Sequence, residues 1–396
     1  MGRLTRAETQ RLNRAGILAA AREEFAERGF RDAKIDAIAD RAELTRGAVY
    51  SNFPGKRALY FAVLADLAER TPKPPPAEPP RTAREALGAF ARAWVTRLPL
   101  ATDRRHGEAR LGMDLFPEVL ADERTRRPFA QLMKLDALLL GLALERLRPP
   151  GPSSPGPSFP GSSFPGSPFP GSSSSGAAGP PWERPGGRMI RVAEAALTTL
   201  HGASQMAAAA PGFVEPFDIV GACERLTGLD LGDRWPQPQL VPPAHPADEP
   251  WSPPPATDLI TGAPAPLTGD GVVAILGLHR LSGAEAAVRA APPGSEVTVV
   301  MVTADPAELA PLARLAIADL CVCLHQAFPP AALPRLRVVC DERGAVAAAA
   351  GVPAVADATE VAVRVRAGRI ITRAEGLGAC HAAAAARTRE APVRDR

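Results

Sequence analysis

The 396-residue chain has few cysteines and only short apolar runs, whereas disulfide-rich proteins and membrane proteins are rich in these features. Its five cysteines are unevenly spaced, so the sequence predicts neither a disulfide framework nor a zinc site. The longest apolar runs, such as Leu138 to Leu144, are far too short to span a bilayer. No signal peptide is visible, because the N-terminus leads directly into a charged helical pattern. We therefore expect a cytoplasmic protein without a membrane segment, a metal or a cofactor.

Lysine is also scarce, with only four residues, and the net charge is a modest +3. Affinity for nucleic acid would therefore have to come from local clusters of charge rather than from the whole surface. The length suggests two or three domains, and 46% hydrophobic residues are enough to build their cores.

Residues 1–70 have the pattern of a small helical module. Ile17, Leu18, Ala21 and Phe25 recur at helical spacing, and Gly29 is expected to end that helix in a left-handed conformation. A second helix is expected at about 35–41, followed by a tight turn at 42–44. Thr45 is a natural N-cap for a third helix at 46–52.

The third helix has the layout of a recognition helix. Ala48, Val49 and Phe53 would anchor it, which leaves an outward set comprising Arg46, Gly47, Tyr50 and Ser51. A fourth helix is expected to begin at about Lys56, where free backbone N–H groups and an ammonium group would suit a phosphate.

Three motifs in order, IL-x-AA-x-x-x-F-x-x-x-GF, ID-x-IA and LTRGAVYSNF-x-x-K-x-x-L, resemble the N-terminal domain of TetR/AcrR-type regulators. The resemblance covers about 50 residues and implies a DNA-binding protein, in which the contacts fall on Lys34, Thr45, Arg46, Gly47, Tyr50, Ser51 and Lys56. Two positions depart from the family pattern. Glu43 replaces a turn glycine, and Lys34 replaces the Ser or Thr that caps the second helix.

Each of these side chains also has a plainer interpretation. Tyr50 could be a surface aromatic and Lys56 a solvated charge, although the ordered set favours DNA contact. Arg46 could read a guanine edge, contact a phosphate or merely be solvated, and the last two rank first.

Residues 81–230 are expected to form a helical domain for ligand binding and dimerisation, with helices at 83–98, 111–120, 124–147 and 188–210. The resemblance implies that its last helices form a four-helix dimer interface, and packing within one chain is the alternative. The Pro-, Gly- and Ser-rich stretch at 149–187 is expected to be a disordered insertion without a specific role, and weak contacts of Phe159, Phe164 and Phe169 with a partner are the alternative.

A ligand cavity is expected among these helices, and its target is an unknown small-molecule effector. The candidates for its lining are Phe90, Trp94, Met113, Phe116, Phe129, Met133, His201, Gln205 and Met206. Core packing is the alternative for each apolar candidate, and a hydrogen-bonded core role is the alternative for the polar pair His201 and Gln205.

The last third of the chain differs in pattern. A proline-rich linker is expected at 232–268 and a disordered tail at 387–396. Between them, strands alternate with helices, which predicts an α/β domain at 269–386. The strands are expected at 272–278, 297–302, 336–340 and 361–365. The segments VTVVMVTADPAEL, VVCDERGAVAAAAGVP and EVAVRVRAGRIITRAEG are similar to peroxiredoxin-like thioredoxin folds.

The cysteine that such an enzyme needs is missing, because the segment after the first strand of this domain reads LHRLSGAEAA. Cys321 and Cys323, spaced by two as on one face of a strand, are candidates for a redox pair, but buried small hydrophobic side chains are the plainer interpretation. The sequence therefore predicts a multidomain protein with an all-α N-terminal half and a C-terminal thioredoxin-like domain. We expect a homodimeric, ligand-responsive repressor of a palindromic DNA operator and no enzyme. An oxidoreductase and a redox-responsive regulator are the alternatives.

Overall fold

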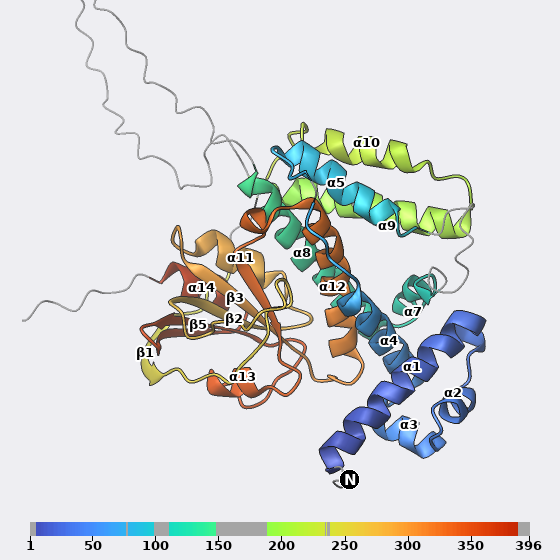
Figure 1. Cartoon of the computed structure of the whole chain (residues 1–396). Coiled ribbons are helices and arrows are strands. Elements are labelled where there is room, and N and C mark those ends of the chain that lie inside the picture. Colours follow the sequence, from blue (N-terminus) through green and yellow to red (C-terminus); the bar gives the residue numbers. More distant parts are fainter. Residues whose placement is uncertain are drawn as a thin grey trace, which may run out of the picture.

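The computed structural model describes residues 5–76, 78–98, 111–147, 188–233, 235 and 238–386. The insertion expected at 149–187 and the tail expected at 387–396 lie outside the described residues. Within the described ranges, a helical N-terminal half packs directly against a C-terminal domain built on a six-stranded sheet (Figure 1).

The N-terminal module contains α1 (Arg6–Asp32), α2 (Ile35–Arg41), α3 (Arg46–Asn52) and the start of α4 (Lys56–Arg70). The bounds predicted for the second and third helices and the start of the fourth are confirmed. The expected stop at Gly29 is confirmed in part: Gly29, with φ 75° and ψ 172°, interrupts the helical backbone at a kink, and a further short helical segment runs on to Asp32. The ψ value is far from the left-handed helical region that a glycine stop uses.

The helical half continues with α5 (Ala83–Val95), α7 (Leu115–Leu120), α8 (Glu123–Arg146), α9 (Ile190–Ala209) and α10 (Pro216–Leu226). The two long helices match their predicted ranges within two residues. In this chain α8 is packed between α9 and α12 (Leu309–Ala327), a helix of the C-terminal domain. Much of the surface of α8 is therefore buried by the same chain.

The sheet of the C-terminal domain has the strand order β1-β6-β5-β2-β3-β4. Its strands are β1 (His245–Pro250), β2 (Gly271–Gly277), β3 (Glu296–Val302), β4 (Leu336–Cys340), β5 (Glu360–Arg366) and β6 (Arg369–Glu375). The neighbours β2, β3 and β4 are parallel, whereas β5, β6 and β1 are joined by antiparallel pairing. The predicted α/β alternation is confirmed.

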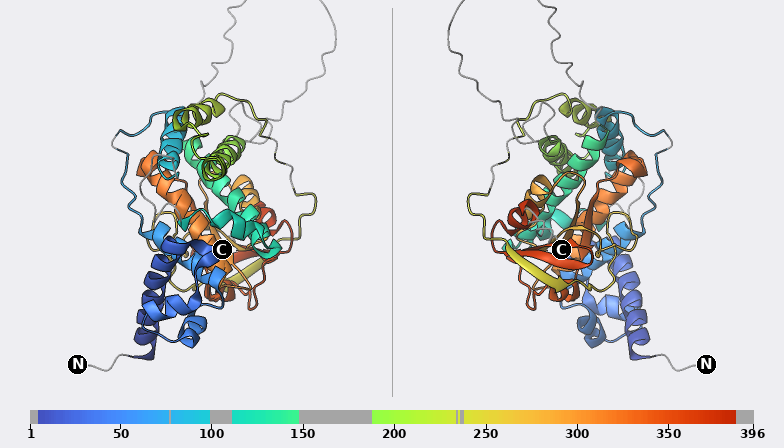
Figure 2. Two further views of the ribbon diagram at one scale, coloured as in Figure 1. Left: turned by 90° about the vertical axis from the view of Figure 1, so that its right-hand side faces the viewer. Right: turned by 90° about the vertical axis from the view of Figure 1, so that its left-hand side faces the viewer.

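Short helices cover the sheet on both faces (Figure 1), and in two further views the N-terminal module, in dark blue, lies at the lower end of the molecule (Figure 2). Helices α11 (Gly283–Ala290) and α14 (Ala379–Ala385) pack together on one face. On the other face, α13 (Ala345–Ala349) and Trp251 close a second apolar cluster. A short 3-10 turn, η2 (Pro330–Ala332), leads into β4.

The linker predicted at 232–268 is partly wrong, because its second half belongs to the C-terminal domain. Strand β1 pairs with β6, Trp251 is buried, and its indole Nε1 donates to Leu267 O at 2.7 Å. The two prolines of β1 made this segment look like a linker, but an edge strand tolerates proline because only one of its sides is hydrogen-bonded.

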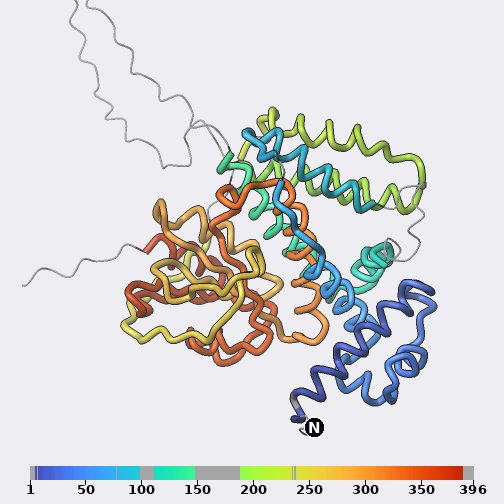
Figure 3. The backbone as a smooth tube through the Cα atoms, in the orientation of Figure 1, coloured from blue at the N-terminus to red at the C-terminus, as the bar shows by residue number. Residues whose placement is uncertain are grey.

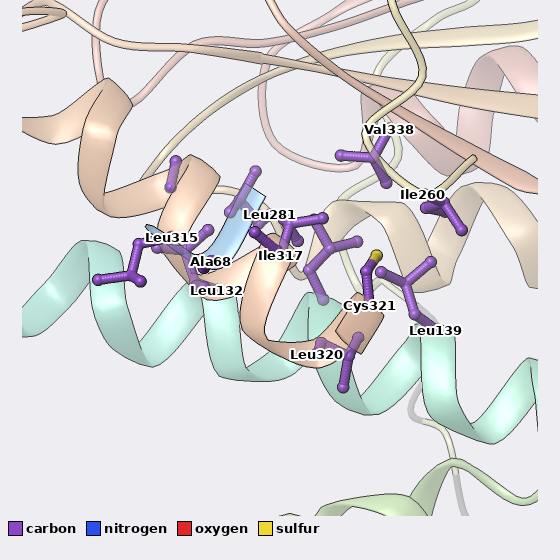
Figure 4. Close-up of a cluster of buried hydrophobic side chains, with 14 of the residues drawn as sticks. Ala68, Leu132, Leu139, Ile260, Leu281, Leu315, Ile317, Leu320, Cys321 and Val338 are labelled. Carbon is purple, nitrogen blue, oxygen red and sulfur yellow. The ribbon is translucent and has the colours of Figure 1, made fainter. Parts of the chain in front are cut away.

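Helix α12 joins the two halves of the molecule. It connects β3 to β4, yet it packs against α4, α5 and α8 of the helical half (Figure 3). The buried side chains of α12 belong to one continuous core with Ala68 of α4, Leu132 and Leu139 of α8, and Val338 of β4 (Figure 4). Although α12 is long and apolar enough to cross a membrane, 78% of its apolar window is buried within the protein, as in a core helix.

Several local features on which the thioredoxin-like resemblance rests are present. Asp341 directly follows β4, the short α13 comes next, and the β5–β6 hairpin turns at Ala367 and Gly368, which both have positive φ. The assignment of the whole domain to a thioredoxin-like fold stays a prediction. Cys321 and Cys323 were wrongly placed on a strand, since both lie in α12, where a spacing of two turns the side chains to different sides.

Candidate nucleic-acid interface and cavity

The turn between α2 and α3 places Glu43 at φ 53°, the left-handed conformation for which a glycine is best suited. The turn closes through two backbone bonds, from Leu44 N–H to Ala39 O at 3.0 Å and from Glu43 N–H to Asp40 O at 3.1 Å. The non-glycine residue costs about 1 kcal/mol in this conformation. This departure from the family pattern is tolerated without loss of the turn.

Helix α3 has one buried and one exposed side, as predicted. Val49 and the following Phe53 are buried, and Thr45 caps the helix by accepting a hydrogen bond from Ala48 N–H at 3.2 Å. The exposed side carries Arg46, Gly47, Tyr50 and Ser51. The Ser51 hydroxyl donates to Ala48 O at 2.8 Å and accepts from Asn52 Nδ2 at 3.5 Å, so one acceptor lone pair is left for an outside donor.

Arg46 is held in place by two neighbours. Its guanidinium lies 3.3 Å from Asp36 Oδ1 on α2 and 5.5 Å from the centre of the Tyr50 ring. Arg14 of α1 supports the other end of the helix, since it donates to Asn52 O at 3.2 Å and lies over the Phe53 ring. These contacts orient the Arg46 guanidinium and join the end of α3 to α1.

Lys56 is engaged within the chain rather than free at the start of α4. Its ammonium donates to Arg31 O and to Ala33 O, each at 2.9 Å, and lies 4.7 Å from the centre of the Phe30 ring. Burial lowers the pKa of this ammonium. The predicted phosphate contact therefore has a structural alternative, in which Lys56 stabilises the connection between α1 and α2.

The α2 N-terminus depends on a residue that the sequence reasoning missed. Lys34 makes no side-chain cap and its side chain is exposed. Its backbone N–H instead donates to Glu24 Oε1 at 3.3 Å, and Glu24 is fully buried beside Arg28 and Arg41. A glutamate buried in α1 was the available signal, but only the fold shows that it reaches α2.

Arg57, also missed, connects three parts of the protein. It lies in the first turn of α4, where Nη2 is 2.9 Å from Asp122 Oδ2 at the start of α8 and Nε is 2.5 Å from Glu308 Oε1 at the start of α12. A second link joins Arg314 of α12 to Glu69 of α4 at 3.1 Å. Ion pairs therefore join the first and last turns of α4 to the C-terminal domain, in addition to the packing between them.

A cavity of about 650 Å³ lies between the helical half and α12, within the size range of small-molecule sites. Its lining includes most of the predicted candidates, namely Trp94, Met113, Phe116, Phe129, Met133, His201 and Gln205. Two candidates do not line it: Phe90 is fully buried in the core beside Trp94, and Met206 is exposed. The sequence did not indicate that α12 would supply one wall, through Leu312, Leu315, Ala316, Asp319 and Leu320.

The aromatic residues of the cavity surround His201. The imidazole centre lies 4.7 Å from the Trp94 ring, 5.5 Å from Phe116 and 6.4 Å from Phe129. Burial lowers the pKa of His201 to about 4, and Nε2 has no hydrogen-bond partner among the described residues. The ring is therefore neutral near pH 7.

Two carboxyl groups also line the cavity. Asp136 of α8 is only 3% exposed, and its Oδ1 has no hydrogen-bond partner in the described part of the chain. Burial raises its pKa well above the ordinary value, and Asp319 of α12 raises it further. Asp319 is itself paired with Arg97.

The five cysteines are free, and burial raises the pKa of every thiol. The pKa of Cys321 rises to about 12 and that of Cys323 to about 11, while their sulfur atoms lie near Leu259 O and the Arg97 guanidinium. A thiolate is the reactive form of cysteine, so these environments disfavour redox chemistry. The described residues contain no cluster of three or more His, Cys, Asp or Glu able to hold a metal.

Comparisons with known proteins identify the N-terminal segment. Residues 17–63 match the sequence model of the family described as bacterial regulatory proteins, tetR family. A segment of 65 residues is 48% identical to the HTH-type transcriptional regulator SrpR of Pseudomonas putida, covering 16% of this chain and 30% of SrpR. The same identity over the same length relates the chain to the uncharacterized HTH-type transcriptional regulator TtgW, from a strain of the same species, covering 48% of that protein.

The chain thus spans less than half the length of either curated relative. Among solved structures, a TetR transcriptional regulator from Rhodococcus sp. RHA1 aligns with 55% of this chain and 94% of its own, at 18% identity and a TM-score of 0.32.

Proposed function

We propose, from the TetR-type helix-turn-helix domain that residues 17–63 form, that this chain is a DNA-binding transcriptional regulator. The observation that carries the proposal is the exposed face of α3, which presents Arg46, Gly47, Tyr50 and Ser51 opposite a buried anchor. The helix enters the major groove, while neighbouring donors hold phosphates.

Gly47 supports a close approach of α3 to DNA. A Cβ atom at this position would meet only Thr45 Oγ1, at 3.8 Å, so the packing of the protein itself does not require a glycine. Tyr50 is 42% exposed, and its hydroxyl reaches a backbone phosphate from the same face. Lys34 adds a cation beside α2, whereas Lys56 acts chiefly by fixing the α1–α2 connection.

The regulator responds to a small molecule in the cavity. Leu64, Leu67 and Ala68 of α4 line the cavity, and the same helix begins in the helix-turn-helix module. An occupant therefore acts on the module through α4, provided that it binds the DNA-free arrangement more tightly than the DNA-bound one. Release from the operator on ligand binding makes the protein a repressor.

The active form is a homodimer on a palindromic operator, with one copy of α3 for each half-site. Because α8 is covered by α9 and α12 of the same chain, a second copy has to use another surface. Phe213 and Phe217, beside the α9–α10 connection, are 72% and 84% exposed, and Met206 lies on the last turns of α9. Large exposed apolar side chains near each other are typical of such contacts.

The test is to select DNA fragments that the purified full-length chain retains, to sequence them, and to measure affinity by fluorescence anisotropy. Tyr50→Phe is expected to weaken binding by about tenfold, because one charge-assisted hydrogen bond to a phosphate is lost. Gly47→Ala is expected to weaken it further through the added methyl group. The matched control is Arg92→Ala, which removes an exposed arginine from α5, in the helical half.

Selected fragments with two related half-sites at a constant spacing would support both the operator and the dimer. Fragments without a common sequence, or unchanged affinity in both α3 variants, would contradict the proposed interface.

A further inference from the structure

The buried carboxyl group of Asp136 is the least explained polar group of the cavity. It lies in the middle of α8 among leucines, at positions 132, 135, 138, 139 and 140, that are all buried. An unpaired carboxyl in such surroundings is costly to bury. Because Asp136 lines the cavity, the missing partner is expected to come from a bound molecule.

Among the described residues, the cationic side chains of the cavity lining pair elsewhere than with Asp136. Arg97 is paired with Asp319, Arg70 with Asp66 at 2.8 Å, and Arg22 is engaged by a neighbour as well. The charge that acts on Asp136 is that of Asp319, which has the same sign. Among the described residues of the lining, Asp136 is therefore a carboxyl group whose Oδ1 lacks a partner, and it suits a hydrogen-bond donor of a ligand rather than another acceptor.

The remaining walls suit the apolar body of a ligand and the face of a cation. Trp94, Phe116 and Phe129 supply aromatic rings, which attract a positive charge placed over them. His201 adds no competing positive charge, since its ring is neutral near pH 7. Leucines of α12, which packs against α4, complete the apolar surface.

We infer that the cavity binds an aromatic or alkyl amine, whose protonated nitrogen lies between Asp136 and Asp319 while its apolar body packs against the aromatic rings and the α12 wall. This inference rests on the proposed function only in treating the cavity as the effector site. The ligand contacts α8 from the helical half and α12 from the C-terminal domain at the same time.

The experiment is isothermal titration calorimetry on the full chain, without DNA, using three probes that share one ring system. Naphthylethylamine carries a cation, naphthylethanol is its neutral counterpart, and naphthylacetate is an anion. The amine is expected to bind at least about tenfold more tightly than the alcohol, with the acetate weakest. Binding should also release up to about one proton per ligand, because the ammonium favours the ionised form of Asp136.

Asp136→Asn keeps the size of the side chain and is expected to reduce the affinity for the amine to that for the alcohol, without proton release. Asp218→Asn is the matched control, since it removes an exposed carboxylate at the start of α10 and should leave the probe series unchanged. The probe series on the unaltered chain tests the amine preference by itself, so the inference stays testable even if the Asp136→Asn variant fails to fold.

Equal affinity for amine and alcohol, tighter binding of the acetate, or no binding of any probe would overturn the inference. A chain that selects no DNA sequence but prefers the amine would refute the proposed regulator and leave this site intact. Sequence-selective DNA binding without an amine preference would do the reverse.

Discussion

Asp136→Asn should change the pH dependence of stability, because the buried carboxyl is neutral in the folded protein. Burial and Asp319 raise its folded pKa above the unfolded value of about 4. As pH rises through the window between these two pKa values, the unfolded chain loses a proton that the folded protein keeps. The free energy of unfolding then falls by about 1.4 kcal/mol per pH unit relative to a chain without this group.

The assay is equilibrium urea unfolding of both proteins, at pH steps from about 4 upward. Near pH 4 the two proteins should agree within about 1 kcal/mol, because asparagine and a protonated aspartic acid have similar shapes. At higher pH the variant should become progressively the more stable protein, until the folded pKa is passed. A constant difference across the whole range would refute the reasoning, since it would mean that Asp136 is ionised in both states.

Other contacts of the cavity and its surroundings give four further predictions. The folded pKa of His201, about 4, is below the unfolded value of about 6.5, so the buried neutral imidazole contributes stability that is lost as pH falls from about 6.5 to about 4. His201→Phe should remove up to about 3 kcal/mol of this acid sensitivity in the same urea series. An unchanged loss of stability at acid pH would show that the imidazole is solvated. Lys56→Met should lower the free energy of unfolding by about 1 to 3 kcal/mol, because two carbonyl acceptors lose their donor; lower DNA affinity at unchanged stability would instead indicate a phosphate contact. Ala316→Phe should fill the cavity from the α12 side and weaken amine binding at least about tenfold, as calorimetry would show, and unchanged affinity would place the ligand elsewhere. The native chain should show no fast-reacting thiol with a disulfide reagent until it is unfolded, and a rapid thiol at neutral pH would revive the redox-responsive alternative.

Local signals explain what the sequence predicted well. Neighbouring residues determine the turn at Glu43, the Thr45 cap and the start of α4 after Gly55. The predicted bounds of α2 and α3 therefore matched those of the structure. The cavity candidates were found because aromatic and polar residues interrupt otherwise apolar helices. Contacts between distant segments could not be inferred in this way, as the engagement of Lys56 by Arg31 O and Ala33 O shows.

Helix α12 is the main feature that the sequence did not reveal. Apart from Arg314, Asp319 and its last turn it is apolar around its circumference, so its pattern has no clear period and the spacing of Cys321 and Cys323 suggested a strand. A helix that is apolar all round needs partners on every side, but the sequence alone does not name them. Here the partners are the sheet on one side and α4, α5 and α8 on the other.

The position of α12 has a practical consequence for anyone who divides this protein. A cut in the proline-rich segment near residue 238 would follow the sequence, yet it would remove one wall of the cavity and uncover the apolar side of α4. Each fragment would then expose surface that belongs inside a core, and aggregation of the isolated halves would say nothing about the intact chain. The two halves therefore form one folding unit, and a substitution in the core of either half is expected to change the stability of both.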